Sequence, residues 1–528
     1  MDDHKRQALR ALPAVEEVMS RPEVASLVEK HSRSQVVEAV RRTLDDLRQA
    51  ILEGAAPASP APQARGAVAP RGPSGRTEPV WDGLLERVAG LLASWERPGL
   101  RRVFNLSGII VHTNLGRSRL PEAAVERVLE VARSYSNLEY DLEAGERGNR
   151  EVFVEELLCR LTGAEAAFAV NNNAGAVLLL LMALAGGREV LVSRGQLVEI
   201  GGSFRLPDIM RAGGVRLVEV GTTNRTRLAD YEAAITEDTA MLLRVHTSNF
   251  RIIGFTEEVE LAQLVDLGRR RGLVVADDLG SGALAEWESF RGEPAVVSSL
   301  RAGADVVCFS ADKLLGGPQA GVLVGRREVL QRLRKHPVAR ALRLDKMTLA
   351  ALEATLRLYQ DPERARREIP TLRYLARTPE ETARLAGLLL EAIERACGSR
   401  PAGGLLMEVE ATTARAGGGS MPLIELPSHA VRMRFPEPPV ESRPGGTARP
   451  TGVAGGPAGP PESEVGPAGQ RVLSAIALEA ALRRAPVPVI ARISQESLLL
   501  DVLALEEQEV EEVAAGVAWV LSELGVHG

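Results

Sequence analysis

The chain of 528 residues is 45% hydrophobic and 25% charged, which is ordinary for a soluble globular protein of about two to four domains. Its net charge of −6 argues against indiscriminate nucleic-acid binding over the whole surface, but it does not exclude a local basic patch. The three cysteines stand far apart without a CxxC pair, which argues against a disulfide framework or a zinc site and fits a reducing compartment.

No segment of the sequence is expected to enter a membrane. The N-terminus, MDDHKRQALR, is charged and runs directly into a polar helical pattern, unlike a signal peptide. The longest apolar run, which starts at Ala176, is about half the length that a membrane span needs. We therefore expect a cytoplasmic protein with neither a membrane nor DNA as a partner.

Residues 1–53 are predicted to form an N-terminal helical domain. Apolar residues recur there at a spacing of three and four, as at Val36 and Val40, and the pattern breaks near Pro22. Residues 54–78 are rich in Ala, Pro and Gly and cannot bury enough apolar area to offset the entropy cost of ordering. We expect them to form a flexible linker.

Residues 79–361 alternate short β-rich runs with helical segments. This pattern predicts βαβ units and a mostly parallel central sheet with helices on both faces, the large domain of an α/β protein. Ligands bind such sheets at the carboxyl ends of the strands. The β-rich runs are AAFAVNN, EVLVSR, VRLVEVG, TAMLLRVH, LVVADD, DVVCFSAD and GVLVGR.

Residues 362–528 are expected to form a small C-terminal α+β domain, because helices dominate there and only a few strand-like runs occur. These runs are MPLIELP, AVRMRF, VPVIARI and SLLLDVL. Residues 436–469 are rich in Pro and Gly and have strand-like runs on both sides. We predict that they are a disordered insertion within this domain rather than a boundary.

A lysine follows one predicted strand in the segment DVVCFSADKLLGGPQAG, residues 305–321. The apolar strand ends at Phe309, and the polar loop then presents Ser310, Asp312 and Lys313 before a glycine turn. A lysine at the carboxyl edge of a sheet can form a Schiff base with pyridoxal 5'-phosphate once burial and nearby positive charge favour its neutral amine. Alone, Lys313 would more simply be a solvated loop lysine, but its neighbours favour the cofactor hypothesis.

Two further features belong to the same hypothesis. Asp277 and Asp278 end another apolar strand, where a carboxylate can keep the pyridine nitrogen of the cofactor protonated. A helix-capping or Mg²⁺-binding aspartate is an equally good interpretation of that pair alone. Asn172, Asn173 and Ala174 form a turn between a strand and a helix, whose backbone N–H groups suit a phosphate.

The chain order of these three features is informative. A phosphate turn, then a strand-end aspartate, then a strand-end lysine some 35 residues later is the order of the aspartate-aminotransferase-like fold (fold type I) of pyridoxal-phosphate enzymes. We therefore predict this fold class and this cofactor.

Longer motifs make the chain similar to a particular family of such enzymes. Between about Phe104 and Tyr359 it resembles the bacterial selenocysteine synthases, also called L-seryl-tRNA(Sec) selenium transferases. HTNLGR, EIGGSF and RALRLDKMT are distinctive of that family and its close relatives. The full set of matching stretches is SGIIVHTNLGRSRLP, SNLEYDLEAGERGNR, AVNNNAGAVLL, SRGQLVEIGGSFRLPDIM, VGTTNRT, VHTSNFRIIGFT, DDLGSG, SADKLLGGPQAG and ARALRLDKMTLAALEATL.

The resemblance implies a reaction and its partners. Seryl-tRNA(Sec) would be converted to selenocysteinyl-tRNA(Sec), by β-elimination of the serine hydroxyl to a dehydroalanyl-tRNA intermediate and then addition of selenium from selenophosphate. Lys313 would remove the Cα proton. The family also implies a homodecamer with active sites at subunit interfaces, and tRNA binding by residues 1–53. The mixed charge of that module gives no independent support for RNA binding.

The resemblance also assigns roles to residues. Arg117, Arg340 and Arg343 match positions that bind the selenium-donor anion, which guanidinium forks suit; a solvated basic face or a tRNA-phosphate patch is the alternative. Asp312 matches a catalytic position, unless it is a turn carboxylate. Asp278 matches the family's aspartate better than Asp277 does. His112 and His246 are either cofactor-positioning or structural histidines.

The sequence departs from the family pattern in three places. The linker at 54–78 and the insertion at 436–469 are longer than expected, and LLLD near the C-terminus is not followed by an arginine. Two rival functions stay open. One is an ammonia-lyase or racemase-like enzyme that acts on a small free substrate. The other is a tRNA-binding or oligomerisation protein on an inactive cofactor scaffold, against which the presence of Lys313, Asp278 and Ser310 argues.

Overall fold

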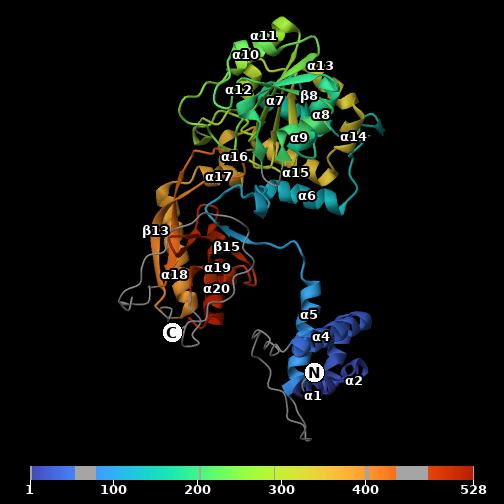
Figure 1. Ribbon diagram of the computed structural model, residues 1–528, viewed down its shortest axis with the longest axis vertical. Helices are drawn as coiled ribbons and strands as arrows, with labels where there is room; N and C mark the ends of the chain where they lie inside the picture. Colours follow the sequence, from blue (N-terminus) through green and yellow to red (C-terminus); the bar gives the residue numbers. More distant parts are fainter. Residues whose placement is uncertain are drawn as a thin grey trace. The chain divides into compact units, whose positions relative to one another are not determined.

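A computed structural model describes residues 3–53, 79–200, 204–290, 292–398, 404–435 and 474–526 of the chain (Figure 1). The chain divides into two compact units, one up to Arg102 and one from Val103 onward. The predicted linker at 54–78 and the predicted insertion at 436–469 lie outside the described residues.

The first unit is helical, as predicted. Its longest helix packs against the last one through a core that includes Val40, Leu44, Leu84 and Val88. Residues 79–96 therefore group with the N-terminal helices, whereas the sequence placed them at the start of the large domain. The predicted break is present, since one helix begins at Pro22. The helices are α1 (Asp3–Ala11), α2 (Val15–Met19), α3 (Pro22–Lys30), α4 (Arg33–Glu53) and α5 (Pro79–Glu96).

The second unit contains a seven-stranded sheet in the order β4-β12-β11-β10-β9-β5-β8. Five neighbouring strands are parallel, and β12 is antiparallel to both of its neighbours, so the sheet is mostly parallel as predicted. All seven predicted strands of this region are confirmed. They are β4 (Ala166–Val170), β5 (Glu189–Ser193), β8 (Arg216–Val220), β9 (Thr239–Val245), β10 (Val274–Gly280), β11 (Val306–Ser310) and β12 (Gly321–Gly325).

Helices cover both faces of this sheet. The helix α8 packs on one face, which Phe168 and Leu243 share, while α7, α11 and α12 pack on the face that Leu242 and Val307 share. Because both faces are buried, these strands read as continuous apolar runs rather than as alternating patterns. The helices of this region are α6 (Glu122–Arg133), α7 (Val152–Thr162), α8 (Asn173–Ala185), α9 (Leu206–Ala212), α10 (Leu228–Ala234), α11 (Leu261–Arg271), α12 (Val296–Arg301), α13 (Arg327–Lys335), α14 (Pro337–Ala341) and α15 (Lys346–Leu358).

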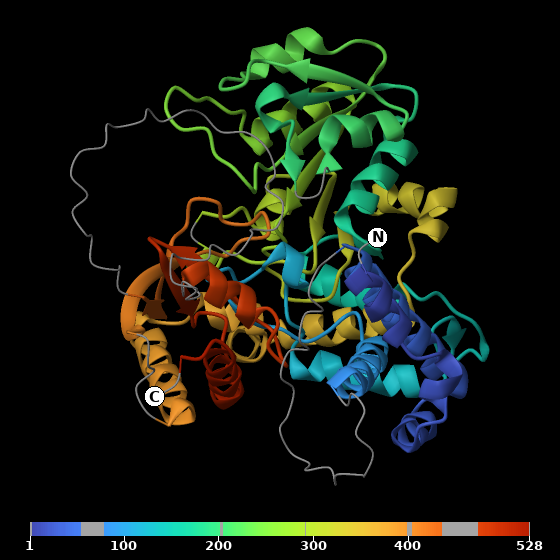
Figure 2. The same ribbon diagram turned by 60° about the horizontal axis from the view of Figure 1, so that its bottom comes forward.

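A second sheet lies in the C-terminal part, in the order β1-β15-β16-β14-β13, with α18 and α20 packed together beside it (Figures 1 and 2). Its first strand comes from the segment that precedes the large sheet in sequence. The elements are β1 (Phe104–Leu106), β13 (Leu406–Ala414), β14 (Leu426–Arg434), β15 (Val489–Ser494), β16 (Ser497–Asp501), α16 (Pro362–Glu368), α17 (Pro370–Leu375), α18 (Pro379–Cys397), α19 (Ala475–Leu482) and α20 (Val510–Glu523).

The predicted strands of this part are confirmed in three cases out of four. The strand predicted for MPLIELP is wrong, because Met421 has a positive φ of 53° and β14 begins only at Leu426. The sequence also missed β13, an edge strand whose side chains are mostly exposed or half-buried. Such a strand lacks the apolar run by which the others were recognised.

Candidate active site

Lys313 lies just beyond the carboxyl end of β11 and is 4% exposed, so it is not a solvated loop lysine. The hydroxyl of Ser118 holds the loop, because its single O–H lies between the carbonyl oxygens of Asp312 and Lys313, at 2.8 and 2.7 Å from its oxygen. Burial, with a smaller contribution from Arg117, lowers the pKa of the Lys313 amine. Nearby carboxylates oppose this shift. The lowered pKa favours the neutral amine that a carbonyl condensation needs.

Two glycines approach the amine of Lys313 from different parts of the chain. Gly280 ends β10, and Gly419 lies in the turn between β13 and β14. A Cβ atom at Gly280 would lie 3.9 Å from Lys313 Nζ, and one at Gly419 would lie 3.5 Å from it. The same two positions are 3.7 and 3.4 Å from the hydroxyl of Ser248. The amine therefore lies between the end of β10 and the turn between β13 and β14, with the Ser248 hydroxyl close to the same two glycines.

Asp277 and Asp278 leave the sheet on opposite faces, because successive residues of a strand alternate. Arg244 binds Asp277 through two hydrogen bonds of 2.7 and 2.8 Å. Asp278 instead accepts a hydrogen bond of 2.8 Å from Asn173 Nδ2, at the start of α8. Burial raises the pKa of Asp278, against which Asn173 and the positive charge of Lys313 act. Of the two aspartates, Asp278 is the one available to the lysine site.

The predicted phosphate turn forms the N-terminus of α8. The side chain of Asn172 caps the helix by accepting a hydrogen bond of 2.9 Å from the Gly175 amide. The amides of Asn173 and Ala174 have no intrahelical acceptor, as at any helix N-terminus, and can donate to an anion. Asn173 also contacts Asp278. This contact joins the phosphate turn to the aspartate at one end of the sheet.

Ser310 closes β11 beside this turn. It is buried, and its hydroxyl makes no hydrogen bond with the part of the chain that the structure describes. Its backbone partner on β12 is Gly321, where a Cβ atom would lie 2.2 Å from the carbonyl oxygen of Asn172. Only glycine lets the phosphate turn pass so close to this strand.

Arg117 is brought to the lysine site by an ion pair with Asp312. Its Nη1 atom lies 2.6 Å from Oδ2 of that buried carboxylate. Arg117 has a φ of 62°, a left-handed conformation that is unfavourable for a residue with a side chain. The ion pair with Asp312 helps to offset this cost.

The other two predicted anion-binding arginines make no contact with Lys313. Arg340 is exposed on α14 and forms no ion pair within the described ranges. Arg343 pairs with Glu139 at 3.4 Å, and its backbone bridges to Val170, directly before the phosphate turn. Among these three arginines, only Arg117 reaches the lysine loop within this chain.

Reasoning from the sequence missed several residues around the amine. The buried carboxylate of Glu293 lies 3.2 Å from His246 Nε2 and accepts a hydrogen bond of 3.1 Å from the Met421 amide. Burial acts to raise the pKa of Glu293, but interactions led by His246 hold it below its usual value. The glycine run at 417–419, with three positive φ angles, was the available signal for this turn.

Several buried polar atoms near these residues have no hydrogen-bond partner within the described part of the chain. They include the hydroxyls of Ser248 and Ser281, His112 Nδ1 and Asn173 Oδ1. Buried polar atoms are normally paired in native proteins. Such a group of unpaired atoms fits a polar ligand bound beside Lys313.

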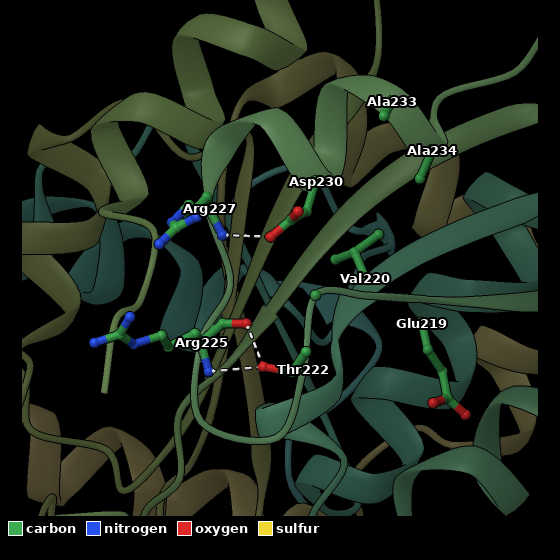
Figure 3. A pocket seen from close by; sticks show the side chains of 9 residues that line it. Glu219, Val220, Thr222, Arg225, Arg227, Asp230, Ala233 and Ala234 are labelled. Atoms are coloured by element: carbon green, nitrogen blue, oxygen red, sulfur yellow. Dashed lines mark hydrogen bonds between the residues drawn. The ribbon is translucent and has the colours of Figure 1, made fainter. Parts of the chain in front are cut away.

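The structure also has a separate hollow of about 590 Å³ at the end of β8, lined by Thr222, Arg225, Arg227 and Asp230 among others (Figure 3). Asp230 accepts a hydrogen bond from the Arg227 amide, and Thr222 bonds to the backbone of Arg225. None of the predicted site residues lines it. We therefore place the candidate active site at Lys313 and not at this hollow.

The described residues contain neither a cluster of metal ligands nor a membrane-spanning helix. No group of three or more His, Cys, Asp or Glu side chains there could hold a metal ion. Over the same ranges, no helix is long and apolar enough to cross a membrane.

Comparison with known proteins gives matches along most of the chain. A family model described as L-seryl-tRNA selenium transferase matches residues 103–443, and one described as selenocysteine synthase N terminal matches residues 9–48. The L-seryl-tRNA(Sec) selenium transferase of Moorella thermoacetica is 46% identical over 525 residues, which are 99% of each chain. That of Geotalea daltonii is 44% identical over 515 residues, which are 97% of this chain and 99% of its own.

Among solved structures, that of D-glucosaminate-6-phosphate ammonia-lyase matches with a TM-score of 0.52 at 21% identity, and covers 81% of this chain and 97% of its own. At this identity the likeness concerns the fold alone. Together with the sheet order described above, it confirms the predicted aspartate-aminotransferase-like fold, fold type I.

Proposed function

The chain belongs to the L-seryl-tRNA selenium transferase family, and from this premise we propose that it performs the family's reaction with pyridoxal phosphate held at Lys313. The activity is that of an L-seryl-tRNA(Sec) selenium transferase, which serves selenocysteine biosynthesis. The observation that carries the cofactor assignment is the buried Lys313 amine with a lowered pKa, in a setting of unpaired polar atoms.

The residues present fit this cofactor. Lys313 would bind its aldehyde, Asp278 would face its ring nitrogen, and the Asn173 and Ala174 amides with the Ser310 hydroxyl would hold its phosphate. The Asp278 Oδ2 atom makes no hydrogen bond within the described residues, so it is free for the ring nitrogen. When bound, the cofactor supplies an electron sink that stabilises negative charge at the substrate Cα.

The chain's own residues would move the protons. The amine of Lys313, whose pKa is lowered mainly by burial, can accept the Cα proton of the seryl group in its neutral form. Asp312 lies next to it and is fixed by Arg117, so it can orient the lysine loop. The close glycines at 280 and 419 leave the space above the amine to the substrate.

We further propose that Arg117, Arg340 and Arg343 bind selenophosphate. Arg117 has five N–H donors and uses Nη1 on Asp312, so the rest of its guanidinium can reach an anion. Arg340 and Arg343 are exposed in a single chain. In the homodecamer that we propose from the family resemblance, they could complete a neighbouring subunit's site.

The remaining proposals concern partners and location. Residues 1–53, most of which match the selenocysteine synthase N-terminal model, would bind the tRNA. The enzyme would act in the cytoplasm. Residues 362–528 would form the small domain of the fold.

One assay tests the proposed function. Purified protein is incubated with seryl-tRNA(Sec), selenophosphate and pyridoxal phosphate, with ordinary seryl-tRNA and Lys313→Ala as controls. We expect selenium to be incorporated only into the tRNA(Sec) conjugate and only by the wild type. Consumption of small free amino acids, with seryl-tRNA(Sec) left serylated, would instead identify a lyase.

A further inference from the structure

We propose that Cys308 is a positioning residue for the cofactor: its thiol donates a hydrogen bond to Asp278 and so keeps this carboxylate ionised and oriented toward the ring nitrogen. The inference rests on the proposed function, because Asp278 acts in this way only if pyridoxal phosphate binds. It adds a role for a buried residue that the reaction scheme above does not use.

The sheet register brings the two residues together. In the parallel pairing of β10 with β11, Asp278 lies opposite Cys308, so both side chains leave the sheet on the same face. Cys308 Sγ lies 3.6 Å from Asp278 Oδ1, within the range of a weak S–H hydrogen bond. The register shifts directly after Asp278. This is therefore the last pair before the irregularity, after which Gly280 pairs with Phe309.

The sulfur is the donor in this contact. Burial, followed by the negative charges of Asp278 and Asp277, raises the pKa of the Cys308 thiol well above its usual value, so it keeps its proton at neutral pH. Asn173 Nδ2 donates to the same oxygen, Oδ1, at 2.8 Å. Both donors thus act on one carboxylate oxygen, and Oδ2 stays free among the described residues.

The charge of Asp278 depends on these donors. Burial favours its neutral form, and a neutral carboxyl cannot stabilise a protonated ring nitrogen. A hydrogen bond donated to the ionised form favours that form. Replacement of Cys308 by a residue without a donor should therefore favour the neutral form of Asp278. The interaction of Asp278 with the ring nitrogen of the cofactor should then weaken.

The test compares two ligands in four proteins. Wild type, Cys308→Ala, Cys308→Val and Cys308→Ser are titrated with pyridoxal phosphate and with its 1-deaza analogue, in which a C–H group replaces the ring nitrogen. Valine fills the space of the thiol with one methyl group more and without a donor, and serine keeps a donor. Cys159→Ala removes a half-buried thiol elsewhere and serves as the control for thiol loss.

We expect the alanine and valine variants both to bind pyridoxal phosphate about fivefold more weakly, the value of one net hydrogen bond. They should bind the deaza analogue as the wild type does, and the serine and Cys159→Ala variants should keep affinity for both. Equal weakening for both ligands, or normal binding by the valine variant, would overturn the role of the thiol.

The proposed function can fail separately. If the wild type shows no aldimine absorbance band after unbound pyridoxal phosphate is removed, or if Lys313→Ala shows the same band, then the cofactor site itself is wrong. If the wild type binds as expected and the Cys308→Val variant binds equally well, only the inference about Cys308 is wrong.

Discussion

The carboxylate of Glu293 and the backbone amide of Met421 are joined by a hydrogen bond of 3.1 Å. The two residues lie 128 positions apart, and the bond fixes the glycine turn at 417–419 beside the Lys313 amine. The other oxygen of Glu293 faces His246 at 3.2 Å. One buried carboxylate thereby connects the turn between β13 and β14 to the large sheet.

Replacement of Glu293 tests this connection. Glu293→Ala should lower the free energy of unfolding by about 1–3 kcal/mol, because it leaves the Met421 amide without its acceptor. Glu293→Gln keeps an acceptor and should cost less. Hydrogen exchange at residues 417–421, together with denaturant melts, measures both effects. Unchanged exchange in the alanine variant would contradict the role of Glu293.

The same residue predicts a pH dependence. The pKa of Glu293 is lower in the folded protein than in the unfolded chain, so its contribution is present above the unfolded value and is lost as the pH falls through the folded value. Between these two values the wild type should lose stability that Glu293→Gln does not lose. Denaturant melts of both proteins across the acidic range measure this difference. If the free energy of unfolding fell equally with pH in both proteins, the prediction would be wrong.

Lys313→Ala should abolish the visible absorbance band and the selenium transfer, because no other amine replaces it in the buried site. Lys335→Ala, which removes an exposed lysine at the end of α13, is the control and should keep both. The measurements are the tRNA assay and the absorbance spectrum, recorded after incubation with pyridoxal phosphate and removal of the unbound cofactor. A band of normal strength in Lys313→Ala would disprove the assignment.

Arg117 and Arg343 should differ in their effect on stability. Arg117→Ala leaves the buried Asp312 unpaired and should lower the free energy of unfolding by about 1–2 kcal/mol. This is less than for a fully buried ion pair, because Arg117 is itself partly exposed. Arg343→Ala breaks a pair with the half-buried Glu139 and should cost less than about 1 kcal/mol. Both should raise the KM for selenophosphate. If both variants showed the wild-type KM for selenophosphate, neither arginine would belong to the anion site.

Gly419→Ala should impair the cofactor site. Its Cβ atom would lie 3.5 Å from Lys313 Nζ and 3.4 Å from Ser248 Oγ, at a φ of 74°. Gly163→Ala has nearly the same φ, 75°, but no atom within 4 Å of the added Cβ. Each should lose about 1–2 kcal/mol of stability through the backbone, whereas only Gly419→Ala should lose cofactor affinity. Equal affinities would show that the space above the amine is not used.

Removal of residues 1–102 should abolish binding of tRNA(Sec) and leave the visible absorbance, because these residues form a compact unit separate from the one that holds Lys313. A cut at residue 53 would instead expose the face of α5 that packs on α4. Filter binding with tRNA(Sec) and another tRNA measures the effect. Retained binding by the truncated protein would place the tRNA site elsewhere.

Local patterns in the sequence were sufficient for the strands of the large sheet and for the lysine, the phosphate turn and the aspartate pair at their ends. A strand buried on both faces is a short apolar run, and a polar residue directly after it must lie at the sheet edge. The exposed edge strand β13 has no such run, and the wrong strand at 421–427 was an apolar run in a turn.

Only the tertiary structure separated the two neighbouring aspartates by their contacts. Asp277 and Asp278 are adjacent in sequence, and it is Arg244 on one face and Asn173 with Cys308 on the other that distinguish them. The contacts of Glu293 and Gly419 with the lysine site could not be predicted from the sequence either. Gly419 lies more than 100 residues from Lys313 in the chain, and Glu293 lies 128 residues from Met421. A local pattern carries no information about such distant partners.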